Sequence, residues 1–466
     1  MDTSPEASPT VTAPSGSGNA PTRTGSGLAG IFERGSASLT NLSAYAFGLS
    51  GLWTGVGTGI LPFKVLEIIE SNPVIIFGYQ LDKNGTLGLI SLSGLAVAAA
   101  VQPLSGIMSD RSSGLLGRRV PYILLGSAGL AFLAFYFGAA TSFIALMLAI
   151  MFMQVFGNLG QGPANALIID HVHPARRGIA AGALNLARVL GAGFLVVIVL
   201  RFMGNYDPET GRHWLWASII VMVAVLIITT LWTVLTVRSR RDGLPIHPEV
   251  YVEEAPRHHV TPRRSGGVYA WFLVSLAFVI AAMSSMQVYA LFFLQDVVGL
   301  PNPANGADLL VIVTVGITAL TVIPAGVLTD RIGRDRLLVL AGLIGATGAL
   351  MLLTVSSLSG AMVAGAVLGL SVGIFLSVTW ALANDLVPKR SAARDLGLTS
   401  IAALVGAAIA RISGLGIDAL NHRSPTLGYE VLLVGCAIAF VVAAVMLGRV
   451  ARRPPLEVET DAPSGD

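Results

Sequence analysis

The sequence predicts an all-α membrane protein whose twelve transmembrane helices form two pseudo-symmetric six-helix bundles. Three observations support this fold class: an apolar composition, long uncharged runs, and an internal repeat. The 466 residues are 54% hydrophobic and only 12% charged, whereas soluble domains carry about 25% charged residues. So few charges cannot cover a water-facing surface, so we expect lipid to surround much of the chain.

Apolar runs of about 20 residues mark the spans, because a helix of that length crosses the hydrocarbon core. The alternating segments of about ten residues that are typical of membrane β-barrels are not found. Spans are predicted at 43–67, 86–109, 120–138, 144–169, 179–201, 214–237, 268–295, 309–329, 337–356, 359–384, 396–420 and 427–448.

The segments between and beyond the spans complete the predicted organisation. Residues 1–40 are rich in Ser, Pro, Thr and Gly and lack a signal-peptide core, so we predict a disordered cytoplasmic tail there. A charged segment at 239–266 is predicted to link bundles at 41–238 and 267–450, and 451–466 to form a second cytoplasmic tail.

The basic residues predict the orientation. The net charge of +3 could suggest nucleic acid, but most Lys and Arg fall in alternate loops, such as 110–119 and 238–264. Short loops rich in Lys and Arg mark the cytoplasmic face. We therefore expect both termini in the cytoplasm, a multi-pass protein of the inner membrane, and no nucleic-acid partner. The opposite face receives Lys64, Lys83, Arg201, Arg212 and Arg423.

Charged motifs repeat between the halves. Gly106 and Asp110-Arg111 follow the second span, and Gly326 and Asp330-Arg331 follow the eighth. Parallel repeats of this kind are a transporter architecture. We predict a conformational latch at Gly106, Asp110, Arg111, Arg118, Arg119, Asp170, Arg177, Asp330, Arg331, Arg334, Asp385 and Arg394. The alternative is that these charges are solvated and set only the topology.

The loop pattern G-x-x-x-D-R followed by G-R-[RK], present in two copies, resembles the signature of the major facilitator superfamily. Within it, "VQPLSGIMSDRSSGLLGRRVPYI" (101–123) and "NLGQGPANALIID" (158–170) are similar to the sucrose-transporter and glycoside–cation symporter branch. This chain departs from that branch with Gln154 in place of an Asp and Asn165 in place of an Arg. The resemblance implies the major facilitator fold, a monomer, and loops that latch the halves on the cytoplasmic side.

Four carboxamides lie on one face of the fourth span. Gln154, Asn158, Gln161 and Asn165 are spaced 4, 3 and 4 apart, and that spacing aligns them on a helix. Amides offer donors and acceptors without a charge, which suits hydroxylated solutes. Hydrogen bonds between helices are the alternative. The predicted substrate-binding residues are Gln154, Asn158, Gln161, Asn185, Arg188, Gln287, Tyr289, Trp380 and Asn384.

Arg188 is the most costly residue to place in lipid, since it lies about nine residues into the fifth span. A guanidinium at that depth costs about 3 kcal/mol on insertion scales and should face a cavity or a partner. We consider two roles: a donor to substrate or a gate within the cavity, and a structural arginine tied to helix carbonyls.

Acidic residues are absent from the span centres. Asp296 and Glu67, near the predicted outer ends, are the candidates for coupling to a proton or sodium ion. Glu67 could instead simply pair with Lys64, and uncoupled facilitated diffusion stays open.

Nothing in the sequence indicates an enzyme, a cofactor or a metal site, because it has no nucleotide-binding loop and no Cys/His cluster. We expect a secondary transporter that moves a small solute by alternating access, with a sugar or glycoside as the preferred class. The alternatives are a multidrug or lipophile exporter and a receptor that senses a solute without moving it.

Overall fold

The computed structural model describes residues 36–76, 78–112, 117–172, 177–241, 266–386 and 392–451, in part through the backbone alone. The described residues from Leu39 onward form one compact unit. Twelve helices in the described part are long and apolar enough to span a membrane. They coincide with the predicted spans, so the all-α fold class is confirmed; the ninth ends slightly early, at Thr354.

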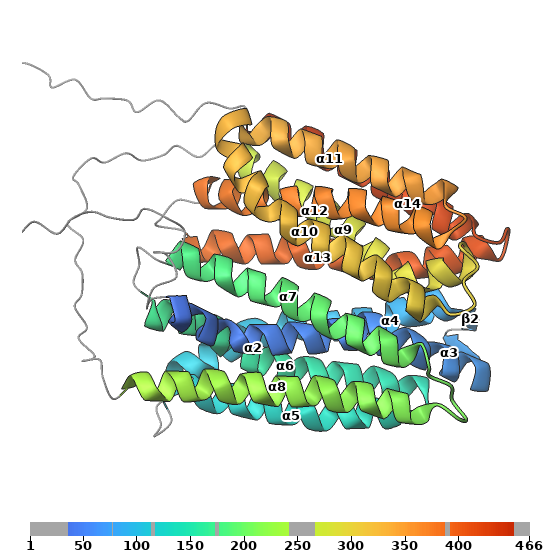
Figure 1. Cartoon of the computed structure of the whole chain (residues 1–466), viewed down its shortest axis with the longest axis horizontal. Coiled ribbons are helices and arrows are strands. Elements are labelled where there is room, and N and C mark those ends of the chain that lie inside the picture. The colour runs from blue at the N-terminus through green and yellow to red at the C-terminus, as the bar shows by residue number, and fades with distance from the viewer. Residues whose placement is uncertain are drawn as a thin grey trace, which may run out of the picture. The chain divides into compact units, whose positions relative to one another are not determined.

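The N-half, residues 39–241, contains seven α-helices, a π-helical turn and a short hairpin (Figure 1). Its elements are α2 (Ser36–Thr54), η1 (Gly55–Ile60), α3 (Leu61–Ser71), β1 (Val74–Ile76), β2 (Tyr79–Leu81), α4 (Lys83–Arg111), α5 (Val120–Ala139), α6 (Phe143–His171), α7 (Arg177–Met203) and α8 (Arg212–Arg241).

The C-half, residues 266–451, contains six α-helices and one 3-10 turn. Its elements are α9 (Gly266–Asp296), α10 (Pro303–Ile332), α11 (Arg334–Met351), η3 (Leu352–Thr354), α12 (Leu358–Leu386), α13 (Ala392–Asn421) and α14 (Leu427–Ala451).

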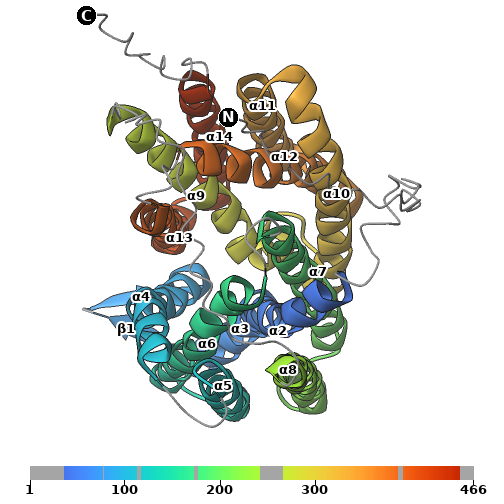
Figure 2. The same cartoon turned by 90° about the vertical axis from the view of Figure 1, so that its left-hand side faces the viewer.

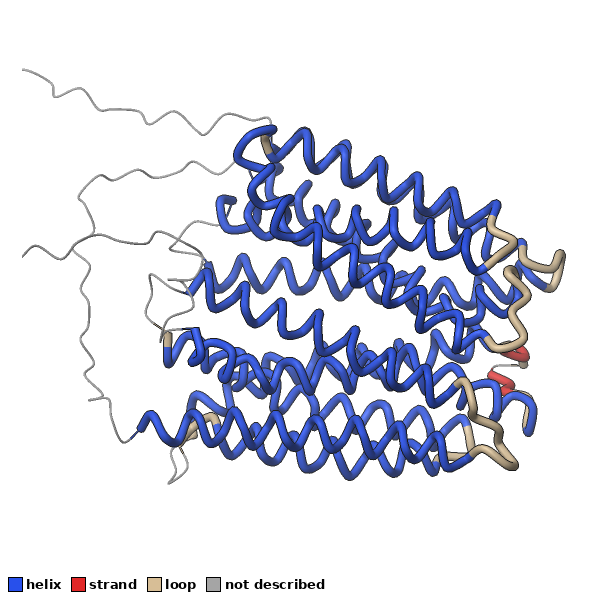
Figure 3. Tube along the Cα trace, viewed as in Figure 1, coloured by secondary structure: helices blue, strands red, loops and turns tan. Residues whose placement is uncertain are grey.

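The two ends of the helices differ in character. The hairpin end holds strands β1 and β2, which pair antiparallel with Ile75 opposite Gln80 (Figure 3). The basic end is the opposite one, where α4 ends at Arg111 and α5 begins at Val120. These two names are used below.

The first span is a composite of α2, η1 and α3. The N–H of Leu61 donates to the carbonyl of Val56, which is the i→i+5 bond of a π turn. Pro62 follows, and it has no N–H to continue the ladder. At Gly55 a Cβ would collide with the Met222 sulfur, so the missing side chain lets this turn pack closely on its neighbours.

Helices of the two halves contact each other mainly through α4 with α13 and α7 with α10. Figure 2 looks along the helices and shows these contacts between two groups of helices. Large apolar side chains on the outside, such as Phe132, Leu320 and Ile323, are more than 70% exposed. Such a surface suits acyl chains, as expected for a protein whose solvent is lipid.

Candidate substrate cavity and charge networks

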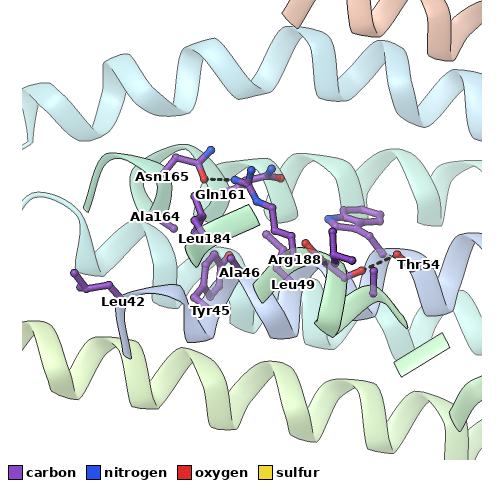
Figure 4. A pocket seen from close by; sticks show the side chains of 14 residues that line it. Leu42, Tyr45, Ala46, Leu49, Thr54, Gln161, Ala164, Asn165, Leu184 and Arg188 are labelled. Atoms are coloured by element: carbon purple, nitrogen blue, oxygen red, sulfur yellow. Dashed lines mark hydrogen bonds between the residues drawn. The ribbon is translucent and has the colours of Figure 1, made fainter. Parts of the chain in front are cut away.

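A cavity of about 320 Å³ lies between α2, α6 and α7 (Figure 4). Helical spacing explains the lining, because side chains three or four residues apart share a face. Tyr45, Leu49 and Trp53 come from α2 in this way, and Gln161 and Asn165 from α6. The lining is mixed. Its polar members are Tyr45, Ser50, Trp53, Thr54, Gln161, Asn165 and Arg188, and its apolar members are Leu42, Ala46, Leu49, Ala164, Leu184, Val189 and Ala192.

Arg188 enters this cavity from α7. Its Nη2 donates to Asn165 Oδ1 at 2.6 Å, and its Nη1 to Asn185 Oδ1 at 3.2 Å. Figure 4 shows the guanidinium beside the side chains of Asn165 and Gln161. Asn185, a predicted binding residue, therefore positions Arg188 and is not itself part of the lining.

The carboxamide stripe of α6 divides in two. Gln161 and Asn165 line the cavity, whereas Gln154 and Asn158 do not. The Asn158 Nδ2 donates to the backbone and side-chain oxygens of Gln154 at 2.8 and 2.9 Å, and Asn158 is buried. Part of the stripe thus satisfies itself within α6, through bonds that are neither contacts with a solute nor the hydrogen bonds between helices considered as the alternative. Asn165, absent from the predicted binding set, is in the cavity.

The other predicted binding residues do not meet in this cavity. Tyr289 is 1% exposed, and its hydroxyl donates to the carbonyl of Arg411 at 2.9 Å. It therefore packs α9 against α13 and presents no surface to a solute. Gln287 on α9 is exposed. Trp380 and Asn384 lie on α12, and their side chains are outside the described part.

At the basic end, four charged residues form a cluster, the basic-end cluster, made of Asp110, Arg118, Arg119 and Asp170. Arg119 lies 2.6 Å from Asp110 and 3.0 Å from Asp170, and Arg118 lies 3.0 Å from Asp170. Burial lowers the pKa of the Arg119 guanidinium, but the pairs with Asp170 and Asp110 raise that pKa by more. All four residues belong to the N-half. The described pairs therefore tie α4, α5 and α6 together, and the expectation that charges at this end join the halves stays a prediction.

Gly106, a predicted latch residue, allows no close approach of helices, because a Cβ there would meet open space. Gly162 on α6 allows it instead, since its Cβ would collide with Ser105 Oγ. Arg111 and Arg331 are exposed, and Arg334 makes an interaction in the described part. The remaining predicted latch side chains, Arg177, Asp330, Asp385 and Arg394, lie outside the described part.

At the hairpin end, polar contacts do cross between the halves. Lys83 lies 2.6 Å from Asp296, and the Tyr429 hydroxyl lies 2.7 Å from the same carboxylate and 3.1 Å from Asn84 Oδ1. The Asn84 Nδ2 and the Gly85 N–H donate to Asp418 at 2.9 and 2.6 Å. This chain of bonds connects α4 to α9, α13 and α14.

A second crossing contact joins α7 to α10. The fully buried Asp308 carboxylate forms an ion pair with Arg201, whose Nε lies 2.5 Å from Oδ2. The Asn302 side chain donates to the carbonyl of Gly204 beside it, at 2.5 Å.

The proposed coupling acids both have cationic partners. Besides the Asp296 pair, Glu67 lies 2.7 Å from Lys64 and 2.9 Å from Arg212, and Tyr206 donates to it at 2.7 Å. Burial first, and then the charge of Glu67, raise the pKa of the Tyr206 hydroxyl. Since Lys64, Arg212 and Tyr206 all contact Glu67, its geometry is that of an anchor between α3 and α8.

Asp308, Asp418 and Arg201 are site residues that the sequence reasoning missed. Asp308 lies one residue before the predicted start of its span, and the sequence analysis assigned it no role. One signal in the sequence could have indicated this role of Asp308. Cations, among them Lys83 and Arg201, are predicted on the same face as Asp296 and Asp308. In the parts of the chain that the structure describes, no group of His, Cys, Asp and Glu could hold a metal ion.

This combination of twelve spans, a polar cavity within the bundle and contacts between halves at one end defines a membrane transporter. The sequence profile of the Major Facilitator Superfamily matches residues 44–410 and again 303–466. The chain belongs to that superfamily, so it is a transporter with the fold of two six-helix bundles, and not an enzyme.

Solved structures agree on the fold. The chain is similar to a D-xylose–proton symporter, with a TM-score of 0.65 and 15% identity over 91% of this chain and 99% of that one. It is also similar to a peptide transporter, with a TM-score of 0.66 and 14% identity over 89% and 95%. A bacterial homologue of the lysosomal transporter Spinster, in its inward-facing and unoccupied conformation, has a TM-score of 0.62 and 17% identity over 89% and 94%. No curated protein matches this sequence.

Proposed function

We propose that the protein moves a small hydroxylated solute, of the sugar or glycoside class, across the inner membrane by alternating access. The cavity between α2, α6 and α7 carries this proposal, because hydroxyl, carboxamide and indole groups meet there beside a guanidinium. Hydroxyls and amides exchange hydrogen bonds with a polyol, and an aromatic ring packs against the apolar face of a sugar ring.

The contacts at the hairpin end support an assignment of conformation. Lys83–Asp296, Arg201–Asp308 and the bonds to Asp418 all hold the halves together at that end. The basic loops favour the cytoplasmic side for the other end and for both termini. We therefore assign the structure to an inward-facing state, in which the hairpin end is external and closed.

Glu67 and Asp296 each lie beside cations at the hairpin end, and neither lines the cavity. The cavity therefore supports solute binding, and it gives no separate support to coupling with a proton or sodium ion.

Uptake of radiolabelled sugars and amphiphiles into proteoliposomes, with and without a pH gradient, tests the function. We expect saturable uptake of a sugar or glycoside, lowered severalfold by Gln161→Ala in the cavity and unchanged by Gln80→Ala in the exposed hairpin. Broad competition by amphiphiles would indicate an exporter of lipophiles. Ligand-induced stabilisation without flux would indicate a receptor, and uptake indifferent to the gradient would exclude proton coupling.

A further inference from the structure

We infer that the transported solute carries one negative charge, bound by Arg188, and that the substrate class is sugar acids: polyhydroxylated monocarboxylates of about one pyranose ring. The inference rests on the proposed transport function and narrows its substrate class.

Arg188 is the only charged member of the described cavity lining. Its two partners in the described part, Asn165 and Asn185, are neutral amides. A guanidinium has five N–H donors, so three of them remain for a ligand. Because neutral oxygens leave the positive charge uncompensated, a ligand carboxylate would find both charge and a planar donor fork.

Four cations at the hairpin end show one way in which this chain supports a charge. Lys64, Lys83, Arg201 and Arg212 each have a carboxylate within 2.9 Å. Arg188, which is deeper in its span and more costly to hold there, has no acid in the described lining. Its missing anion is thus best supplied by the solute.

The other residues of the lining indicate the chemistry of the rest of the solute. The Gln161 side chain makes no hydrogen bond in the described part, and the Thr54 hydroxyl uses its proton on the Ser50 carbonyl, so its oxygen can still accept. These groups, with the Trp53 indole, suit a ring that bears several hydroxyls. One guanidinium matches one carboxylate, whereas a phosphate dianion would keep a second charge unmatched.

Ligand-dependent thermal stability of the purified wild-type protein tests the charge. The probes are glucuronate, its neutral isostere glucuronamide, glucose 6-phosphate and acetate. We expect glucuronate to raise Tm at concentrations about tenfold to hundredfold below those needed for glucuronamide, the ratio typical of a hydrogen bond to a charged group. Equal response to both, no response to glucuronate, or a stronger response to the phosphate would overturn the inference.

Variants locate the effect. Arg188→Gln should bind glucuronate and glucuronamide alike, while Arg188→Lys should keep the preference for glucuronate at lower affinity, because it keeps the charge and loses the fork. Arg411→Gln is the matched control, since Arg411 is also a span arginine but donates to Ala407 within its own helix and does not line the cavity. Loss of the preference in Arg411→Gln alone would contradict the assignment.

Proteoliposome flux separates the two proposals. Uptake of neutral glycosides without uptake of glucuronate would refute the sugar-acid inference and leave the transport function intact. Absence of flux for both, with glucuronate still raising Tm, would refute the transport function.

Discussion

The two ends of the helices use the same charged chemistry for opposite purposes. At the hairpin end, Lys83–Asp296 and Arg201–Asp308 join the N-half to the C-half. At the basic end, the described ion pairs of the basic-end cluster join α4, α5 and α6 of the N-half alone.

This difference shows that an ion pair near a span end can have either of two roles. A pair within a half makes that half rigid, so that it moves as a body. A pair between halves is made in one conformation and has to break in the other, which is what alternating access requires.

The largest effect is expected for Asp418→Asn. The variant places an amide donor against the Asn84 and Gly85 donors, which removes hydrogen bonds to a charged acceptor, each worth about 1.5–3 kcal/mol. The hairpin end should open in a larger fraction of molecules. Cys436 is first replaced by Ala, and spin labels are attached at positions 79 and 423. Double electron–electron resonance should then report longer distances between the labels in Asp418→Asn than in the parent protein.

Asp207→Asn is the control for that variant. Asp207 is at the same end, but in the described part its carboxylate accepts only from Glu209 and Thr210 in its own turn. The same label pair should show no change. Unchanged distances in Asp418→Asn would mean that the α4–α13 bonds do not hold this end closed.

Arg119→Gln should destabilise the N-half without moving the hairpin end. The substitution removes the pairs with Asp110 and Asp170 and the bond to Ser109 Oγ. Because this arginine is largely buried and its partners are partly exposed, we expect the free energy of unfolding to fall by about 2 kcal/mol. Thermal unfolding should show a lower Tm. A change in the hairpin-end distances instead would mean that the basic-end cluster does latch the two halves.

Glycines at the basic end provide a smaller, matched comparison. Gly162→Ala forces a methyl group into Ser105, and such overpacking costs about 1–3 kcal/mol. Gly106→Ala enters open space and should leave Tm unchanged or slightly higher, since alanine favours a helix. Equal Tm values for the two variants would contradict the packing of α4 on α6.

The smallest effect is expected on thermal stability when the pH is lowered. Hydrogen bonds from Thr210 and Glu209 lower the pKa of the exposed Asp207 carboxyl. Its stabilising effect is therefore complete above the unfolded pKa of about 4 and disappears as the pH falls through the lower folded value. The Tm difference between wild type and Asp207→Asn should be constant from pH 7 to pH 5 and shrink below pH 4. A difference that vanishes near neutral pH would assign the effect to another group.

The spans could be predicted from the sequence because length and hydropathy alone decide whether a helix suits a bilayer. The partners within the basic-end cluster could not, since a charge pattern does not tell which helix an arginine will face. Asp170 and Arg119 are 51 residues apart, and only the packing of α5 on α6 brings them together.

The carboxamide stripe shows the same limit inside one helix. Spacing placed Gln154 and Asn165 on one face, but eleven residues extend roughly 16 Å along a helix. Over that length the surroundings change, so Asn165 reaches the cavity while Gln154 is bound to Asn158 outside it. Periodicity predicts direction around the axis and cannot predict what lies at each depth.

The Lys and Arg ion pairs that close the hairpin end are sorted by sign, whereas the contact of Asp82 with His422, at 3.0 Å, has its acid in the N-half. The cations of the crossing contacts, Lys83 and Arg201, belong to the N-half, and their acids, with Asp418, to the C-half. When the hairpin end opens, these ion pairs separate, and the cations of the N-half would still attract the acids of the C-half weakly. Dissolved ions screen such attraction. Raising the ionic strength should therefore lengthen the distances between spin labels at positions 79 and 423. Unchanged distances would show that this attraction between the halves is negligible.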